Sequence, residues 1–202
     1  MSGQQDAGTS EWRLYWTLPI AAMFGYSAVG LQNFATGAFV VPLESEFGWT
    51  RAEVMFGLSV SSLCGIFLNI FIGMVIDRFG PRRVGLTGLF VKTAAFGLLA
   101  TATGTMLNWS ILWVLVAIGV VLVQSTVWTS AVATRFDRSR GFAMAIALSG
   151  SAVAAAVAPI LATVLIEHFG WRIGFVGVAA AWLLVTAPVV FFCFRSSRDV
   201  AP

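Results

Sequence analysis

The residues with the clearest potential for covalent chemistry are two serines and a histidine. Ser149 and Ser151 flank a glycine, and His168 is the only histidine in the 202-residue chain. A serine nucleophile needs a base within hydrogen-bond reach. We expect both serines near the middle of an apolar helix and His168 in the loop after it, more than two turns away. The groups could not meet, so we exclude a six-helix serine protease of the rhomboid type and expect no enzyme.

The two cysteines offer no second chemistry. Cys64 and Cys193 each lie within an apolar run and are far apart in the sequence. A thiol in such a run packs as a small apolar group, and this spacing matches no metal-binding motif. We therefore expect no disulfide, no metal site and no cofactor.

Uncharged polar residues form the candidate binding groups. One stripe has spacings of 4, 3 and 4 residues and consists of Tyr26, Gly30, Asn33 and Gly37. Residues spaced in this way share one face of a helix. Further along the chain, Gln124 and Trp128 are one helical turn apart. Polar groups in hydrocarbon are costly unless they face a cavity or a partner helix, so two interpretations stay open: substrate contact, or hydrogen bonding between helices.

Lys92 is the only charged residue well inside an apolar run. A charge at the centre of a bilayer costs roughly 2.5–3.5 kcal/mol, so Lys92 is a candidate functional residue. Lys92 lies about 12 Å from the inner end of its predicted helix, at 1.5 Å per residue, so its stem could reach towards water. We expect this snorkelling, or pairing, rather than substrate binding.

No Asp or Glu lies inside any of the apolar runs. The chain therefore offers no carboxylate within the membrane for a proton relay. If the substrate is a carboxylate, we expect its counter-charge to come from outside this chain.

The elements that must position these residues are six transmembrane helices. The chain is 58% hydrophobic and 10% charged, with a mean hydropathy of +0.89. About 20 apolar residues are needed to cross the hydrocarbon core. The uncharged runs predict helices over 14–41, 52–76, 84–103, 109–133, 141–166 and 173–194. We divide the chain into a cytoplasmic tail (1–13), an all-α transmembrane bundle (14–194) and the start of a cytoplasmic loop or tail (195–202).

Local signals mark the predicted helix ends. Thr50 and Glu53 have capping-box spacing at the start of the second helix. Pro42 is expected to end the first helix, and Asp137 or Ser139 to cap the fifth.

Charge placement predicts the orientation. If the N-terminal tail lies inside, that side receives nine arginines: Arg13, Arg78, Arg82, Arg83, Arg135, Arg138, Arg140, Arg195 and Arg198. The other side receives Arg51 and Arg172 only. Basic residues concentrate in cytoplasmic loops, so we expect a multi-pass protein of the plasma (inner) membrane with both termini in the cytoplasm. The net charge of +3 then reflects orientation and indicates no nucleic-acid partner.

Two pairs of segments repeat at nearly the same offset. Residues 77–82 match 167–172 at an offset of 90, with acid, Phe, Gly and Arg in the same order; residues 47–52 match 136–141 at an offset of 89. The first matched loop is predicted inside and the second outside. Helices 1–3 and 4–6 are therefore predicted to form two inverted three-helix repeats, a common transporter design.

A third pattern follows the second predicted helix. It reads Gly73-Met-Val-Ile-Asp77-Arg78-Phe-Gly80-Pro-Arg82-Arg83. This segment resembles the cytoplasmic loop signature of the major facilitator superfamily, a gating motif made of Gly73, Asp77, Arg78, Gly80, Arg82 and Arg83. A glycine such as Gly73 admits a close helix, and Gly80 permits a tight reversal.

The resemblance implies half of a twelve-helix fold. Helices 1 and 4 would line a central cavity, and helices 2 and 5 would meet the other half. The small-residue stripes on helix 2 (Ser62, Gly65, Asn69, Gly73) and helix 5 (Ala147, Ser151, Ala154, Ala158, Ala162) are expected to be the packing surfaces for that half.

Within the superfamily, the chain is most similar to the monocarboxylate-transporter and oxalate/formate-antiporter group. The similar stretches are 47–54, 77–84, Arg140-Gly141 and 169–172. Animal members of that group carry a lysine in helix 1 where a rough alignment places Gln32, so Gln32 joins the candidate contacts without the cation. The chain departs from the family at Leu115, where an arginine is usual, and in helix 5, where alanines replace glycines.

The function expected from these features is transport of a small organic solute by alternating access, and the group resemblance implies a monocarboxylate as the solute class. The expected partners are the lipid bilayer, the solute, and a second six-helix half or another copy. The alternative is a membrane scaffold, or a truncated fragment without activity of its own.

Overall fold

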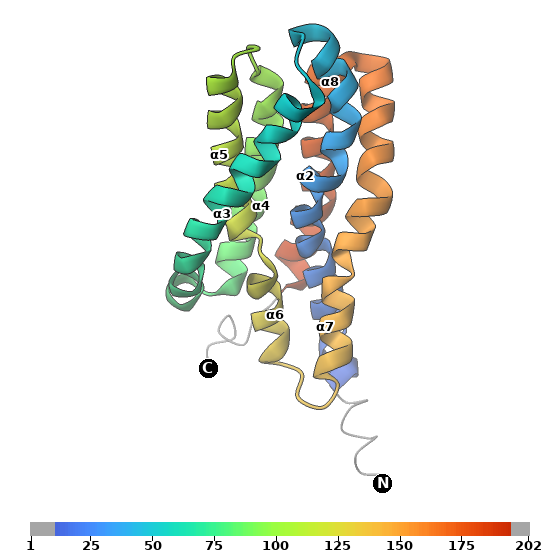
Figure 1. The fold of residues 1–202 in the computed structure, drawn as a ribbon. Helices are drawn as coiled ribbons and strands as arrows, with labels where there is room; N and C mark the ends of the chain where they lie inside the picture. Colours follow the sequence, from blue (N-terminus) through green and yellow to red (C-terminus); the bar gives the residue numbers. More distant parts are fainter. Residues whose placement is uncertain (1–10, 195–202) are drawn as a thin grey trace.

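The computed structural model describes residues 11–194, and helices make up nearly all of that part, with no strand in it (Figure 1). The elements are α2 (Thr17–Phe47), α3 (Arg51–Phe79), α4 (Pro81–Leu98), the 3₁₀ turn η1 (Leu99–Thr101), α5 (Met106–Leu122), α6 (Ser125–Ala133), α7 (Arg140–Leu148) and α8 (Gly150–Cys193). The all-α prediction is confirmed. Residues 1–10 of the predicted tail and the segment 195–202 lie outside the described residues.

Four helical stretches of the described chain are long and apolar enough to cross a membrane: Arg51–Phe79, Pro81–Thr101, Met106–Ala133 and Arg140–Cys193. The last has 54 residues, about 80 Å at 1.5 Å per residue, whereas a bilayer core is about 30 Å thick. Gly170 interrupts it with φ 81° and ψ 165°. The chain reverses there, and Figure 1 shows α8 as two legs.

One predicted helix start is confirmed, and one predicted helix end is wrong. The capping box of α3 is confirmed, because the Thr50 N–H donates to Glu53 Oε2 at 2.7 Å and the Glu53 N–H to Thr50 Oγ1 at 3.3 Å. The predicted end at Pro42 is wrong, since α2 continues to Phe47 and stops at Gly48, whose φ is 68°. A proline removes one hydrogen bond, whereas a glycine in the left-handed region ends the helix.

Two predicted helices are interrupted. Val123 and Gln124 separate α5 from α6, and Gln124 has φ −54° and ψ 158°. The indole Nε1 of Trp128 donates to the Val123 carbonyl at 2.8 Å, which satisfies an acceptor at the break. Ser149 separates α7 from α8. The predicted helix over 109–133 is therefore broken at Val123 and Gln124, whereas the one over 141–166 is only deformed at Ser149, whose backbone stays in the helical region.

Packing of α7 and α8 against α2 overturns one predicted surface, apart from Ser151, which is half-buried. Ala147, Ala154, Ala158 and Ala162 are fully buried, and a Cβ on Gly30 of α2 would lie 2.8 Å from Ala154 Cβ. The small residues let these helices approach each other within the chain, so the helix 5 stripe does not face outwards as expected.

The small-residue stripe of α3 faces outwards in part. Ser62 and Gly73 are exposed, Asn69 is half-buried and Gly65 is buried, although no described atom lies within 4 Å of a Cβ built on Gly65 or Gly73. The two ends of the stripe are therefore open, as the sequence predicts.

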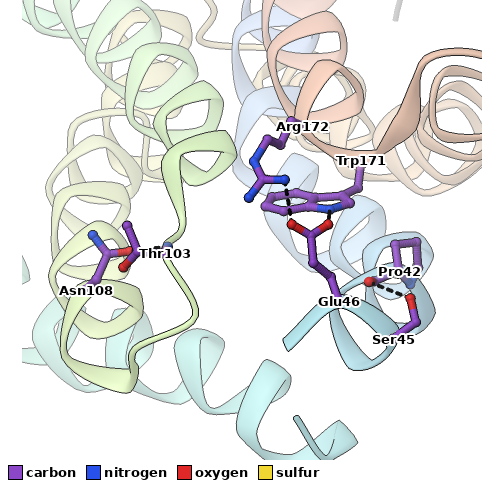
Figure 2. A network of polar contacts seen from close by, with 7 residues as sticks. All are labelled: Pro42, Ser45, Glu46, Thr103, Asn108, Trp171 and Arg172. Carbon is purple, nitrogen blue, oxygen red and sulfur yellow. Dashed lines mark hydrogen bonds and ion pairs between the residues drawn. The ribbon is translucent and has the colours of Figure 1, made fainter. Parts of the chain in front are cut away.

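A carboxylate closes one end of the bundle (Figure 2). Glu46, near the end of α2, accepts hydrogen bonds from Trp171 Nε1 and, at 2.6 Å, from Arg172 Nη1. The indole hydrogen bond, followed by that of the guanidinium, lowers the pKa of Glu46. The contact ties α2 to the second leg of α8 beside the reversal at Gly170.

A second carboxylate closes the opposite end. Glu11 accepts from the backbone N–H groups of Asp137, Arg138 and Ser139 at 3.3 Å each, and from the Ser139 hydroxyl at 2.9 Å. Desolvation would raise the pKa of Glu11, but these hydrogen bonds outweigh it and lower the pKa. The Ser139 side chain therefore binds Glu11, and no side-chain cap forms at α7.

We expect Gly119→Ala to destabilise the bundle. A Cβ there would lie 2.4 Å from Lys92 Cα of α4, and backbone cannot yield as a flexible side chain can, so the loss should be about 1–3 kcal/mol. Gly97→Ala is the matched control, because its Cβ would meet Ala179 at an ordinary 3.5 Å. Thermal unfolding in detergent measures both variants, and equal midpoints would contradict the close α4–α5 packing.

We expect the stability that Glu46 confers to depend on pH. Its pKa is lowered on folding from an ordinary value of 4.5, so the contribution is present above that value and is lost as the pH falls through the folded pKa. Glu46→Gln should therefore lower the unfolding midpoint at neutral pH and have a shrinking effect in acid. The exposed Glu167, near the same end, supplies the control variant Glu167→Gln. A Glu46→Gln deficit that is constant with pH would count against the contact.

Candidate functional site

The predicted polar stripe of α2 is only partly open. Asn33 and Gly37 are exposed, and Tyr26 is half-buried. Gly30 faces inwards against Ala154 and Phe34. The open part is therefore Asn33 and Gly37, near the middle of a 31-residue helix. An amide there can donate to and accept from a small polar molecule.

The second predicted pair lies at the break between α5 and α6. Gln124 is half-buried, whereas Trp128 is fully buried. The Trp128 ring packs edge-on to Phe194 with centroids 5.1 Å apart, and a Cβ on Gly25 would collide with it. Trp128 thus fills the interior between α2 and the end of α8, away from the open face at Asn33.

Two residues that the sequence analysis treats separately meet in the core. Lys92 of α4 is 0% exposed and Gln32 of α2 is 5% exposed. Lys92 Nζ donates a hydrogen bond to Gln32 Oε1 and lies 5.9 Å from the centroid of the Phe96 ring. Of the two predicted fates for Lys92, the structure shows pairing. Gln32 and Lys92 each lie near the middle of their helix, so the sequence places them at a similar depth in the bundle. That similarity is the signal from which the pair could have been predicted.

Gly119 makes room for this pair. Because it lacks a side chain, α5 lies directly against the backbone of Lys92. The lysine side chain is then directed into the bundle towards α2, where Gln32 offers the acceptor. Close approach of two helices at a glycine is a common feature of membrane bundles.

The predicted gating motif forms the corner between α3 and α4. Gly80 has φ 80°, and its N–H donates to the Ile76 carbonyl at 2.8 Å. Pro81 follows as the first residue of α4, a position that needs no N–H donor. The tight reversal predicted at Gly80 is therefore present.

The arginines of this corner have different surroundings. Arg82 Nη2 donates to the Phe191 carbonyl at 2.8 Å, and its Cζ lies 5.6 Å from the Phe191 ring centroid. Arg78 lies over the Phe79 ring at 5.5 Å. Sequence reasoning missed the contact with Phe191, because the two residues are 109 positions apart. Arg82 thereby links the corner to the end of α8.

The remaining motif residues lie on the surface. Asp77 and Arg83 are exposed, as is Gly73 one turn before Asp77. No described atom approaches a Cβ built on Gly73 within 4 Å. The close helix contact predicted at Gly73 is thus not made by the described part of this chain.

Known proteins resemble this chain along most of its length. The chain is 28% identical over 183 residues to an uncharacterized MFS-type transporter, YhcA, of Bacillus subtilis, which covers 89% of this chain and 34% of that protein. It is 25% identical over 170 residues to an uncharacterized transporter of Buchnera aphidicola, with 81% and 39% covered. A shorter match, 35% over 79 residues, is to the multidrug resistance protein MdtH of Proteus mirabilis, with 36% and 20% covered.

The chain therefore spans well under half the length of these relatives. The profile of the Major Facilitator Superfamily matches residues 22–202. That match includes the Gly80 corner, the open face at Asn33 and the Lys92–Gln32 pair, in a helical bundle with membrane-spanning character. The chain belongs to the Major Facilitator Superfamily.

Proposed function

We propose that the chain is the N-terminal half of a secondary transporter that moves a small organic solute by alternating access. The observation that carries this proposal is an exposed amide on α2: Asn33 and the neighbouring Gly37 are exposed at mid-length of an apolar helical bundle. Hydrocarbon is a poor environment for a side-chain amide. A water-filled cavity, closed on its other side by a second bundle, gives Asn33 a suitable environment.

The proposed topology has six crossings in two inverted three-helix repeats. The crossings would be α2, α3, α4 with η1, α5 with α6, α7 with the first leg of α8, and the second leg of α8. In this arrangement the Gly80 corner and the α6–α7 loop share the cytoplasmic side of the plasma (inner) membrane with both termini. The arginine distribution and the opposed directions of successive helices support this proposal (Figure 1).

A second six-helix half would complete the protein. The exposed face of α3 supports this partner, because its apolar side chains are joined there by the small residues Ser62 and Gly73. The relatives are long enough to contain such a half, since this chain spans 34% and 39% of two of them.

A monocarboxylate is the solute class that the group resemblance favours. The exposed Asn33 amide and the half-buried Tyr26 hydroxyl could each donate a hydrogen bond to a carboxylate. The described membrane part of this chain offers no exposed cation beside them, so we assign the counter-charge to the second half. The multidrug label of one relative concerns that protein, which this chain matches over 79 residues.

Single-cysteine labelling tests the topology. In a background that lacks Cys64 and Cys193, we expect Arg83→Cys and Arg138→Cys to react with an impermeant maleimide only from the cytoplasmic side. Thr103→Cys and His168→Cys should react only from the other side. Arg83 and Arg138 on opposite faces would contradict the six-crossing scheme.

Counterflow in liposomes tests transport and the role of Asn33. With a co-expressed C-terminal half, Asn33→Ala should weaken the apparent affinity for a labelled monocarboxylate by about three- to tenfold, the effect of one lost hydrogen bond. Thr87→Ala, at an exposed position of α4 outside the α3 stripe and the proposed binding face, is the control. If Asn33→Ala leaves the affinity unchanged, the Asn33 amide does not bind the solute and serves only in helix packing. The absence of flux for monocarboxylates and other small solutes would favour a scaffold.

A further inference from the structure

Lys92 has too few partners to be held as an ammonium. An ammonium carries three N–H donors and no acceptor. Within residues 11–194, Nζ has one hydrogen-bond acceptor, Gln32 Oε1, and the Phe96 ring at 5.9 Å. The side chain is fully buried. A buried ion needs an opposite charge or a full set of hydrogen bonds, and this environment provides neither.

Charged groups on the surrounding helices lie far from Nζ. Neither α5 nor α6 carries a titratable side chain. On α2, Glu44 is twelve residues from Gln32, about 18 Å at 1.5 Å per residue, and Tyr26 is about 9 Å away by the same measure. The other titratable or charged groups on elements packed against α4 are Glu46 of α2; Arg51, Glu53, Cys64, Asp77 and Arg78 of α3; and Glu167, His168, Arg172 and Cys193 of α8. Apart from Cys64, those of α3 and α8 lie at the ends of the bundle or beside the Gly170 reversal.

We propose that Lys92 and Gln32 form a buried proton-binding site, with Lys92 a neutral amine in the conformation described here. A neutral amine has two N–H donors and a lone pair, so one hydrogen bond to Gln32 Oε1 suffices. Proton uptake adds H⁺ from water to the nitrogen lone pair and breaks no bond in the protein. The ammonium that results needs acceptors that the present packing lacks.

Protonation must therefore accompany a change in the packing of α2. Gln32 directly precedes Asn33, which is exposed, and neighbouring residues of a helix point about 100° apart. A rotation of α2, or its separation from α4, would bring water to the pair from the same face that is proposed to meet the solute. If the chain transports a solute, this site would make the transport depend on protons; that link rests on the proposed function.

The sequence permits a direct test, because Lys92 is the only lysine in the chain. Labelling with [ε-¹³C]lysine gives one side-chain NMR signal in lipid nanodiscs, and its chemical shift separates amine from ammonium. We expect the amine signal at mildly alkaline pH and its conversion to the ammonium signal as the sample is acidified. An ordinary exposed lysine remains an ammonium throughout this range. A signal that stays ammonium, or stays amine, over the whole range would overturn the proposal.

A matched pair of variants tests the role of Gln32. Gln32→Glu places a carboxylate on the amine, so the pH transition should be lost and the ammonium signal kept throughout. Asn33→Asp adds the same charge one residue away on the exposed side and should leave the Lys92 transition close to that of the wild type. Equal effects of the two variants would contradict a specific pair. If Gln32→Glu does not fold, the wild-type titration still decides.

The titration needs no solute, so its outcome is separate from that of the transport assay. If Lys92 titrates but the chain supports no flux, the proposed function is overturned and the proton site stands. If the chain supports flux but Lys92 keeps one protonation state, the proton site is overturned and the proposed function stands.

Discussion

The structure depends on one constraint: in hydrocarbon, polar groups must find their partners within the protein. The tryptophans illustrate how the chain meets it. Trp109 Nε1 donates to the Val54 carbonyl at 3.2 Å and so joins α5 to α3. Trp182 Nε1 donates to Ser27 Oγ at 3.1 Å and joins α8 to α2. Trp128 satisfies the carbonyl that the break after α5 sets free. Each of these three indoles buries a large apolar ring while its N–H binds one defined acceptor, so these contacts also fix which helices are neighbours. The buried Trp113 is the exception, because its Nε1 has no acceptor among the described residues.

Glycines allow these rings and helices to approach. A Cβ on Gly57 would lie 2.1 Å from Trp113 Nε1, and one on Gly25 would lie 2.2 Å from the Trp128 ring. Gly119 has the same role against the backbone of Lys92. Within the bundle the lysine therefore stands at a place set by backbone contact between α4 and α5, and Gln32 meets it from α2. The functional candidates are positioned by the same close contacts that hold the core together.

Local signals made much of the fold predictable. The capping box at Thr50 and the tight reversal at Gly80 each depend on neighbouring residues, and the structure contains both. The apolar runs predicted an all-helical chain, and residues 11–194 are helical apart from short turns and links. Contacts between distant segments were not predictable in this way. The Pro42 stop failed because Gly48 offers a stronger terminator, and the helix 5 alanines turned inwards because α2 carries Gly30 opposite Ala154. In the candidate site, Asn33 was recognised as polar and is exposed. Its neighbour Gln32 could be joined to Lys92 only once the packing of α2 and α4 was known.

The burial of Lys92 has a consequence for the rest of the charge distribution. Since the chain has no other lysine, its remaining basic side chains are eleven arginines and one histidine. Guanidinium groups stay protonated at every physiological pH and are not substrates for amine acylation. The arginine charges are therefore permanent: neither acidification nor lysine acetylation can remove them. Lys92 is the one basic side chain of the spanning core whose charge can change with its surroundings.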